Sequence, residues 1–120
     1  MKYIMNAWSF KMLRKPNGFL AYHEIDIEDF DDFIKDENGQ LYDDVISVMG
    51  QENIANILKI PYNRENIVLN KGDTMYVVYV EGRGRIPENA TTLPKGMELR
   101  ITCAKIIEDK TIGEELKGVV

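Results

Sequence analysis

Two apolar segments of β character in the second half of the chain constrain the fold more than any other feature. Residues 74–80 are rich in β-branched and aromatic side chains, and residues 99–107 form a second apolar run. The glycine- and proline-containing stretch between them, 81–97, is too irregular for one element. We therefore predict two strands joined by a long segment. At its length this segment is more typical of function than of simple connection.

The first half adds short strands and a helix. Residues 2–6 and 20–24 read as strands, the second following a turn at Pro16-Asn17-Gly18. Asp26 can cap a helix, because apolar residues then recur at helical spacing. These residues are Ile27, Phe30, Phe33 and Ile34.

A second helical pattern runs through residues 44–58, although Gly50 interrupts it. We place the start of the regular helix near Gly50 or Gln51 and its stop at Pro61. Residues 66–69 predict a short strand, followed by a turn at 71–73. Together the elements predict an α/β (α+β) domain: a mixed sheet of about five strands with helices packed on it.

Length and composition indicate one globular domain, residues 1–107, followed by a polar tail, 108–120, that can include a short helix. No apolar run is long enough to span a bilayer, and no signal-type segment opens the chain. Cys103 is the only cysteine, which excludes an internal disulfide and favours a buried, hydrophobic role in a reducing, cytoplasmic compartment. The net charge of −5 argues against capture of long duplex nucleic acid.

Few residues carry an obvious chemistry. His23 is the only histidine and has no metal-site spacing, so neither a metal nor a cofactor is expected. The segment Gly82-Arg83-Gly84-Arg85 can form an anion nest with phosphate-binding guanidinium groups, or a hairpin turn with exposed arginines. Trp8 and Tyr62 can stack on nucleobases or belong to the core.

Five segments, in the same order and with similar spacing, resemble the viral ring-nuclease (type III anti-CRISPR) family of archaeal viruses and phages. The segments are Asn6-Ala7-Trp8-Ser9 before Met12-Leu13, Ser47-Val48-Met49-Gly50-Gln51, Asn63-Arg64, Lys71-Gly72-Asp73, and Gly84-Arg85-Ile86-Pro87-Glu88. The resemblance runs from residue 3 to about residue 107. It implies a two-fold dimer that holds cyclic tetra-adenylate across its interface and cleaves it without metal.

The resemblance also implies roles for individual residues. Asn6 and Ser9 would contact the ligand backbone, and Asn63 belongs to the matched Asn-Arg pair of the ligand site. Arg64 and Arg85 would hold phosphates, and Glu88 would assist positioning or proton transfer. The family's general-acid histidine corresponds to Gln51, which cannot deliver a proton at neutral pH.

The leading interpretation is therefore a dimeric protein that binds and sequesters a cyclic nucleotide messenger, blunting an antiviral defence. One alternative is a slow, metal-independent ring nuclease that uses another acid, such as Glu88. Another is a partner-binding protein that has lost nucleotide recognition. A DNA-binding role is disfavoured by the net charge.

Overall fold

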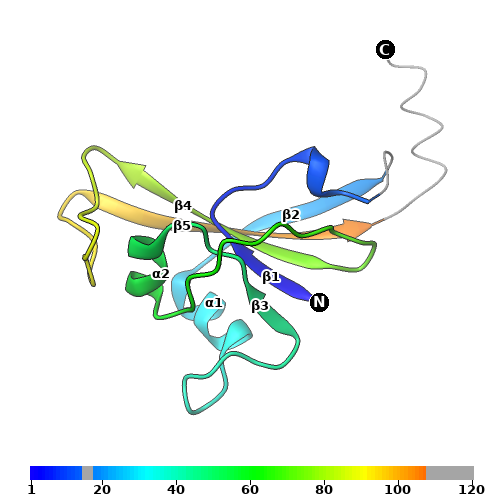
Figure 1. Cartoon of the computed structure of the whole chain (residues 1–120), viewed down its shortest axis with the longest axis horizontal. Coiled ribbons are helices and arrows are strands. Elements are labelled where there is room, and N and C mark those ends of the chain that lie inside the picture. Colours follow the sequence, from blue (N-terminus) through cyan, green and yellow to red (C-terminus); the bar gives the residue numbers. More distant parts are fainter. Residues whose placement is uncertain (15–17, 108–120) are drawn as a thin grey trace.

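Five strands form one mixed sheet in the order β2-β5-β4-β1-β3, and the computed structural model describes residues 1–14 and 18–107 (Figure 1). The strands are β1 (Lys2–Met5), β2 (Phe19–Ile25), β3 (Val45–Ser47), β4 (Thr74–Gly82) and β5 (Met97–Ile107). Two α-helices, α1 (Ile27–Ile34) and α2 (Glu52–Leu58), and a 3₁₀ turn, η1 (Phe10–Met12), complete the described fold. The predicted α/β class, with about five strands in a mixed sheet, is confirmed.

Strand β1, which lies between β4 and the edge strand β3, determines where a site can form. It runs parallel to both neighbours, with Lys2 opposite Val45 of β3 and opposite Thr74 of β4. The carboxyl ends of these parallel strands therefore point the same way, and ligands of open α/β sheets bind beyond such ends. Strand β5 is antiparallel to both β4 and β2.

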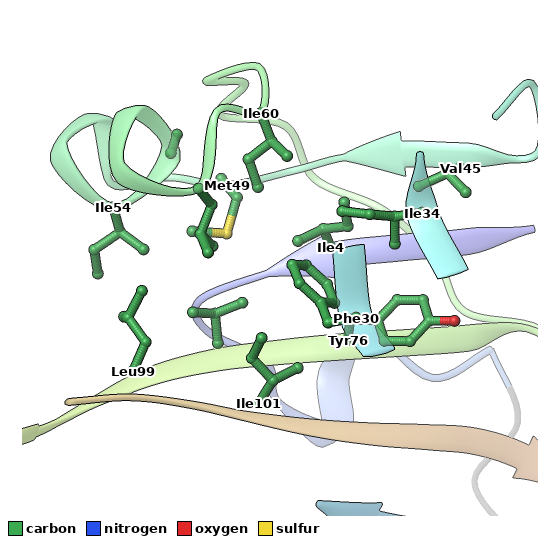
Figure 2. Close-up of a cluster of buried hydrophobic side chains, with 13 residues drawn as sticks. Ile4, Phe30, Ile34, Val45, Met49, Ile54, Ile60, Tyr76, Leu99 and Ile101 are labelled. Carbon is green, nitrogen blue, oxygen red and sulfur yellow. The ribbon is translucent and has the colours of Figure 1, made fainter. Parts of the chain in front are cut away.

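The larger core lies between the sheet and the two helices, which cover the same face (Figures 1 and 2). Phe30 of α1 is fully buried and meets Tyr76 of β4 edge-on, with 5.5 Å between ring centroids. Burial also raises the pKa of the Tyr76 phenol. Ile54 and Leu58 bring α2 onto the same cluster, so the helical spacing of the sequence corresponds to real burial.

A smaller core covers part of the opposite face. There the segment after β1, including η1, packs with Leu69 and Met75 against Ala104 of β5. Backbone hydrogen bonds fasten the segment: the Leu69 N–H donates to the Met12 carbonyl, and the Arg14 N–H donates to the Leu69 carbonyl at 3.0 Å. The N-terminal loop is thus held to the sheet on the side away from the helices.

Two sequence-based predictions of local structure were wrong. The front of the 44–58 helical pattern is strand β3, because Val45 and Ile46 are β-branched and pair with β1. The regular helix is Glu52–Leu58 with Gln51 as its N-cap, so its predicted start near Gly50 or Gln51 is confirmed. Residues 66–69 are not a strand; within them only Leu69 bridges, to Leu13. The α2 helix ends at Leu58, and its C-cap residue Lys59 is left-handed at φ 56°, so the helix stops before the predicted stop at Pro61.

The strands predicted at 2–6, 20–24, 74–80 and 99–107 are confirmed as β1, β2, β4 and β5. Helix α1 begins after Asp26, which occupies the N-cap position but whose side chain makes no capping hydrogen bond, and the turn near residue 72 leads into β4. Cys103 is partly buried against the larger core, and burial raises the pKa of its thiol. The predicted turn at Pro16-Asn17 and the tail 108–120 lie outside the described residues. In the described ranges, no helix has the length and apolar character needed to cross a membrane.

Candidate functional site

Two cavities meet beyond the carboxyl end of β1, and Asn6 and Gln51 line both of them. The first cavity, about 700 Å³, is also lined by Trp8, Ser9 and Arg64. The second cavity, about 650 Å³, is also lined by Tyr79, Arg85 and Glu88. Both volumes lie within the range of small-molecule sites. The structure therefore gathers six of the seven residues predicted from sequence around one pair of adjoining cavities.

Asn6 and Gln51 reach this position through backbone topology. Asn6 directly follows β1, and Gln51 is the N-cap residue of α2 on the connection that leaves β3. Because β1 and β3 are parallel neighbours, their continuing segments remain adjacent. The boundary between the two cavities is thus built by two segments more than 40 residues apart in sequence.

Gly50 is held from both sides by residues of the site. Its N–H donates to Asn6 Oδ1 at 2.9 Å, and its carbonyl accepts from Arg64 Nη2 at 3.4 Å. A Cβ placed on Gly50 would lie 3.6 Å from Asn6 Oδ1 and 3.7 Å from Arg64 Cγ, which is ordinary contact. Neither small size nor a special backbone angle therefore requires a glycine at this position.

The seventh predicted residue, Asn63, does not line either cavity. It forms hydrogen bonds to the chain segments next to the cavities. Its amide nitrogen donates to the Ser47 carbonyl at 3.0 Å and to Glu65 Oε2 at 3.0 Å. Its backbone N–H donates to the Met49 carbonyl, and the buried Ser47 hydroxyl donates to the Pro61 carbonyl. These bonds fix the segment that carries Gly50 and Gln51, so Asn63 positions the site.

The segment between β4 and β5 brings Arg85 and Glu88 to the second cavity. Its anchor is Asn53 of α2, whose amide nitrogen donates to the Ile86 carbonyl at 3.2 Å. Ile86 and Leu93 are partly buried against the larger core. The sequence analysis missed Asn53; the available signal was an amide in the first turn of a predicted helix, a position where side chains commonly bond to backbone groups.

Gly82 and Gly84 have the unusual backbone that the sequence suggested, with φ of 117° and 119°. At Gly82 an added Cβ would lie 2.4 Å from the Gly96 carbonyl oxygen, whereas at Gly84 nothing lies within 4 Å. Gly82 is therefore required where the segment leaves β4, and Gly84 only for its backbone angle. Arg85 lines the second cavity, and Arg83 is exposed and does not line it.

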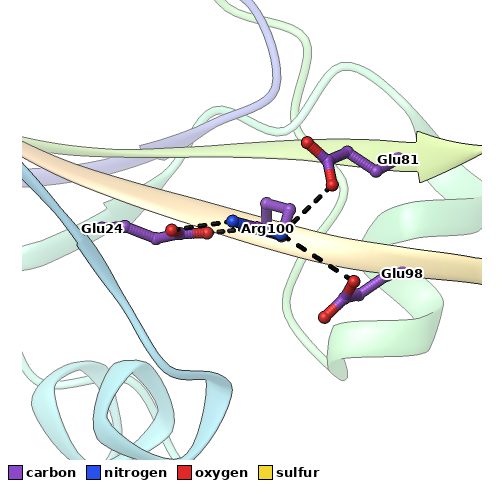
Figure 3. Close-up of polar contacts among 4 residues, drawn as sticks. All are labelled: Glu24, Glu81, Glu98 and Arg100. Carbon is purple, nitrogen blue, oxygen red and sulfur yellow. Dashed lines mark hydrogen bonds and ion pairs between the residues drawn. The ribbon is translucent and has the colours of Figure 1, made fainter.

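The two arginines that line the cavities, Arg64 and Arg85, differ from Arg100 in their carboxylate partners. In residues 1–14 and 18–107, Arg64 and Arg85 are exposed and form no ion pair with a carboxylate. Arg100 of β5 instead chelates the Glu24 carboxylate through Nε and Nη2, and it contacts Glu81 at 3.2 Å and Glu98 at 3.9 Å (Figure 3). The hydrogen bonds from Arg100 lower the pKa of Glu24. Arg100 is neutralised, and the two cavity arginines can pair with an anion.

The described residues contain no cluster of three or more histidine, cysteine or acidic side chains that could hold a metal. His23 is exposed on β2, at the opposite edge of the sheet from β3. Anion binding by arginines and amides is the chemistry that this site can supply.

A mixed five-stranded sheet with two helices on one face and a polar site beyond the end of strand β1 defines a small α+β protein. The chain belongs to the STIV B116-like family, whose model matches residues 2–104. Among solved structures it is similar to B116 of Sulfolobus turreted icosahedral virus (STIV), with a TM-score of 0.61 and 17% identity over 87% of this chain and 97% of that chain. At this identity the likeness concerns the fold. A comparison with curated proteins found no match.

Proposed function

We propose that this protein binds a cyclic oligonucleotide across a two-fold dimer interface and sequesters it. The observation that carries the proposal is the pairing of two adjoining cavities with two exposed arginines, Arg64 and Arg85, that lack carboxylate partners in the described ranges. An acidic chain with such a site suits a compact anion better than a long duplex.

The placement of Arg64 and Arg85 in two different cavities suits a ligand with more than one phosphate. Each guanidinium can chelate one phosphate through two N–H donors, and the Asn6 and Gln51 amides, which line both the cavity of Arg64 and the cavity of Arg85, are neutral donors. A two-fold dimer presents the same groups twice, which matches the symmetry of a cyclic oligonucleotide.

Gln51 favours binding over turnover. In the ring-nuclease family that the sequence resembles, a histidine at this position protonates the leaving oxygen, and glutamine cannot do so. Loss of a general acid typically removes about 10²–10⁴ in rate. Membership of a family named after a viral protein accords with a role in blunting nucleotide-activated antiviral defence.

A slow ring nuclease is the second candidate, and the position of Glu88 favours it. Glu88 shares the second cavity with Arg85 and Gln51, so a carboxyl group lies near the proposed phosphate position. Cleavage would then proceed by attack of a ribose 2′-hydroxyl, aided by positioning and by Arg85.

A panel of cyclic di-, tri- and tetranucleotides, tested by calorimetry and then analysed for products, separates these functions. Tight binding with the intact ligand recovered supports sequestration, and linear product supports the nuclease. Failure of every member to bind would refute both and favour a partner-binding protein. Light scattering tests the dimer, because a monomer at micromolar concentration with and without ligand would contradict a site shared across an interface.

A further inference from the structure

We infer that the first cavity is a nucleobase subsite in which Trp8 is the stacking surface. This inference rests on the proposed function in taking the ligand to be a nucleotide, and it assigns a residue and a part of the ligand that the proposal leaves open. Trp8 lines the cavity that also contains Arg64, so an aromatic face and a phosphate-binding group occupy the same space.

Packing from behind holds Trp8 in place. The side chain is half-buried against the smaller core, beside Met12 and Leu13. Ser9, the next residue, donates its backbone N–H to the Met12 sulfur at 3.3 Å, which fixes the turn that follows Trp8. An indole held in this way loses little conformational freedom when a base stacks on it.

Phe10 adds to this aromatic surface. Its ring meets Trp8 edge-on, with 5.1 Å between centroids and 70° between planes, yet 75% of the Phe10 residue is exposed. Phe10 itself does not line the cavity, so Trp8 supplies the aromatic face there, and Phe10 extends the exposed aromatic surface next to it. Aromatic surface beside polar groups is the combination that recognition of unpaired bases uses.

The rim of the same cavity can read the edge of a base. Glu65 and Asn66 line it and are exposed. A carboxylate accepts hydrogen bonds from exocyclic amino groups, and an asparagine amide can both donate to and accept from adenine. The cavity accordingly favours a base with an amino group, adenine above uracil.

Trp8 is the only tryptophan in the chain, so its fluorescence reports on the subsite directly. Titration with AMP, excited at the red edge of the indole band, is expected to give saturable quenching, and UMP a weaker response. Ribose 5-phosphate, which lacks the base, is the control and is expected to leave the emission unchanged. Cyclic tetra-adenylate is titrated in parallel by fluorescence and by calorimetry.

Variants test the aromatic requirement by calorimetry. Trp8→Leu keeps apolar volume against the smaller core but removes the aromatic face. It is expected to weaken the binding of cyclic tetra-adenylate roughly 5- to 150-fold. Trp8→Phe is expected to stay within a few-fold of wild type. Tyr22→Leu is the matched control, because Tyr22 is an exposed aromatic residue on β2 at the other edge of the sheet.

The outcomes separate this inference from the proposed function. Cyclic tetra-adenylate that binds without changing Trp8 emission would overturn the base subsite and leave the proposed function intact. Saturable quenching by AMP without binding of any cyclic nucleotide would support the subsite and overturn the proposed function. Equal responses to AMP and ribose 5-phosphate, or no response to any probe, would overturn the subsite. The wild-type titrations decide the matter even if Trp8→Leu does not fold.

Discussion

Asn6 Oδ1 accepts a hydrogen bond from the Gly50 N–H at 2.9 Å, which ties the end of β1 to the residue before the α2 cap. The amide oxygen of Asn6 is thus committed to the backbone. Contact with a ligand falls to the amide nitrogen, so one side chain both builds the boundary between the cavities and faces into them.

Substitution of Asn6 separates these two tasks. Asn6→Ala leaves the Gly50 N–H without its partner and is expected to lower the free energy of unfolding by about 1 kcal/mol. Asn6→Asp keeps an acceptor for Gly50 but adds a negative charge, so we expect near-normal stability and weaker binding of cyclic tetra-adenylate. Urea denaturation and calorimetry measure the two effects. If Asn6→Asp bound cyclic tetra-adenylate with wild-type affinity, the phosphate would not bind next to Asn6.

Arg85 and Arg83 are expected to differ in their effect on binding. Arg85 lines the second cavity, so Arg85→Ala is expected to weaken cyclic nucleotide binding by about 1.5–3 kcal/mol, the range for hydrogen bonds to charged groups. Arg83→Ala is the matched control with the same charge change and is expected to cost less. Equal losses in calorimetry would indicate a diffuse basic patch instead of a specific contact.

Gln51→His is expected to create or increase turnover if the missing proton donor is what limits cleavage. The start of α2 lowers the pKa of an imidazole there, so activity is expected mainly at mildly acidic pH. Glu88→Ala in that background is expected to reduce the rate again. Product analysis over a pH series provides the measurement. A wild-type rate equal to that of Gln51→His would refute the lost-acid argument.

Gly82 and Gly84 form a matched pair for testing the backbone of the loop. Gly84→Ala meets no neighbouring atom and is expected to cost about 1–2 kcal/mol from its backbone angle alone. Gly82→Ala bears the same angle cost and also meets the Gly96 carbonyl, so it is expected to cost more and to loosen the loop that carries Arg85. Thermal denaturation compares the two. Equal costs would show that the strand ends separate easily.

The Glu24–Arg100 contact predicts a pH dependence of stability. Hydrogen bonds from Arg100 lower the Glu24 pKa, so its contribution is present at neutral pH and is lost as the pH falls through that lowered value. Glu24→Gln is expected to have a lower urea midpoint than wild type at neutral pH, and the gap is expected to shrink toward about pH 3. The effect is small because the pair is exposed. Glu98→Gln, at 3.9 Å from Arg100, is the weaker control. A gap that is independent of pH would contradict the assignment.

The sequence predicted the sheet and the membership of the site better than it predicted the roles of residues. β-Branched runs identified β4 and β5, and apolar spacing identified α1, because burial of one face imposes those periods. The sequence analysis did not predict the strand Val45–Ser47, because Val45 and Met49 also fit helical spacing. Its pairing with β1 depends on residues far away in the chain.

The hydrogen bonds that stabilise the site could not be predicted either, because they also join residues far apart in the chain. The bonds of Asn63 to Ser47 and of Asn53 to Ile86 join segments 16 and 33 residues apart. No local pattern records such a contact. The sequence could indicate that Asn63 lies near the site. Only its hydrogen bonds show that it stabilises the segment that carries Gly50 and Gln51.

The shared boundary between the cavities limits how the protein can be redesigned. Because Asn6 and Gln51 line both spaces, a substitution at either one alters two halves of the site at once. Trp8 and Arg64 line the first of these cavities, and Tyr79 and Arg85 the second, so each half offers positions that can be varied with the other held constant. Libraries aimed at a new ligand can therefore be built in two independent sets, with the two amides kept constant.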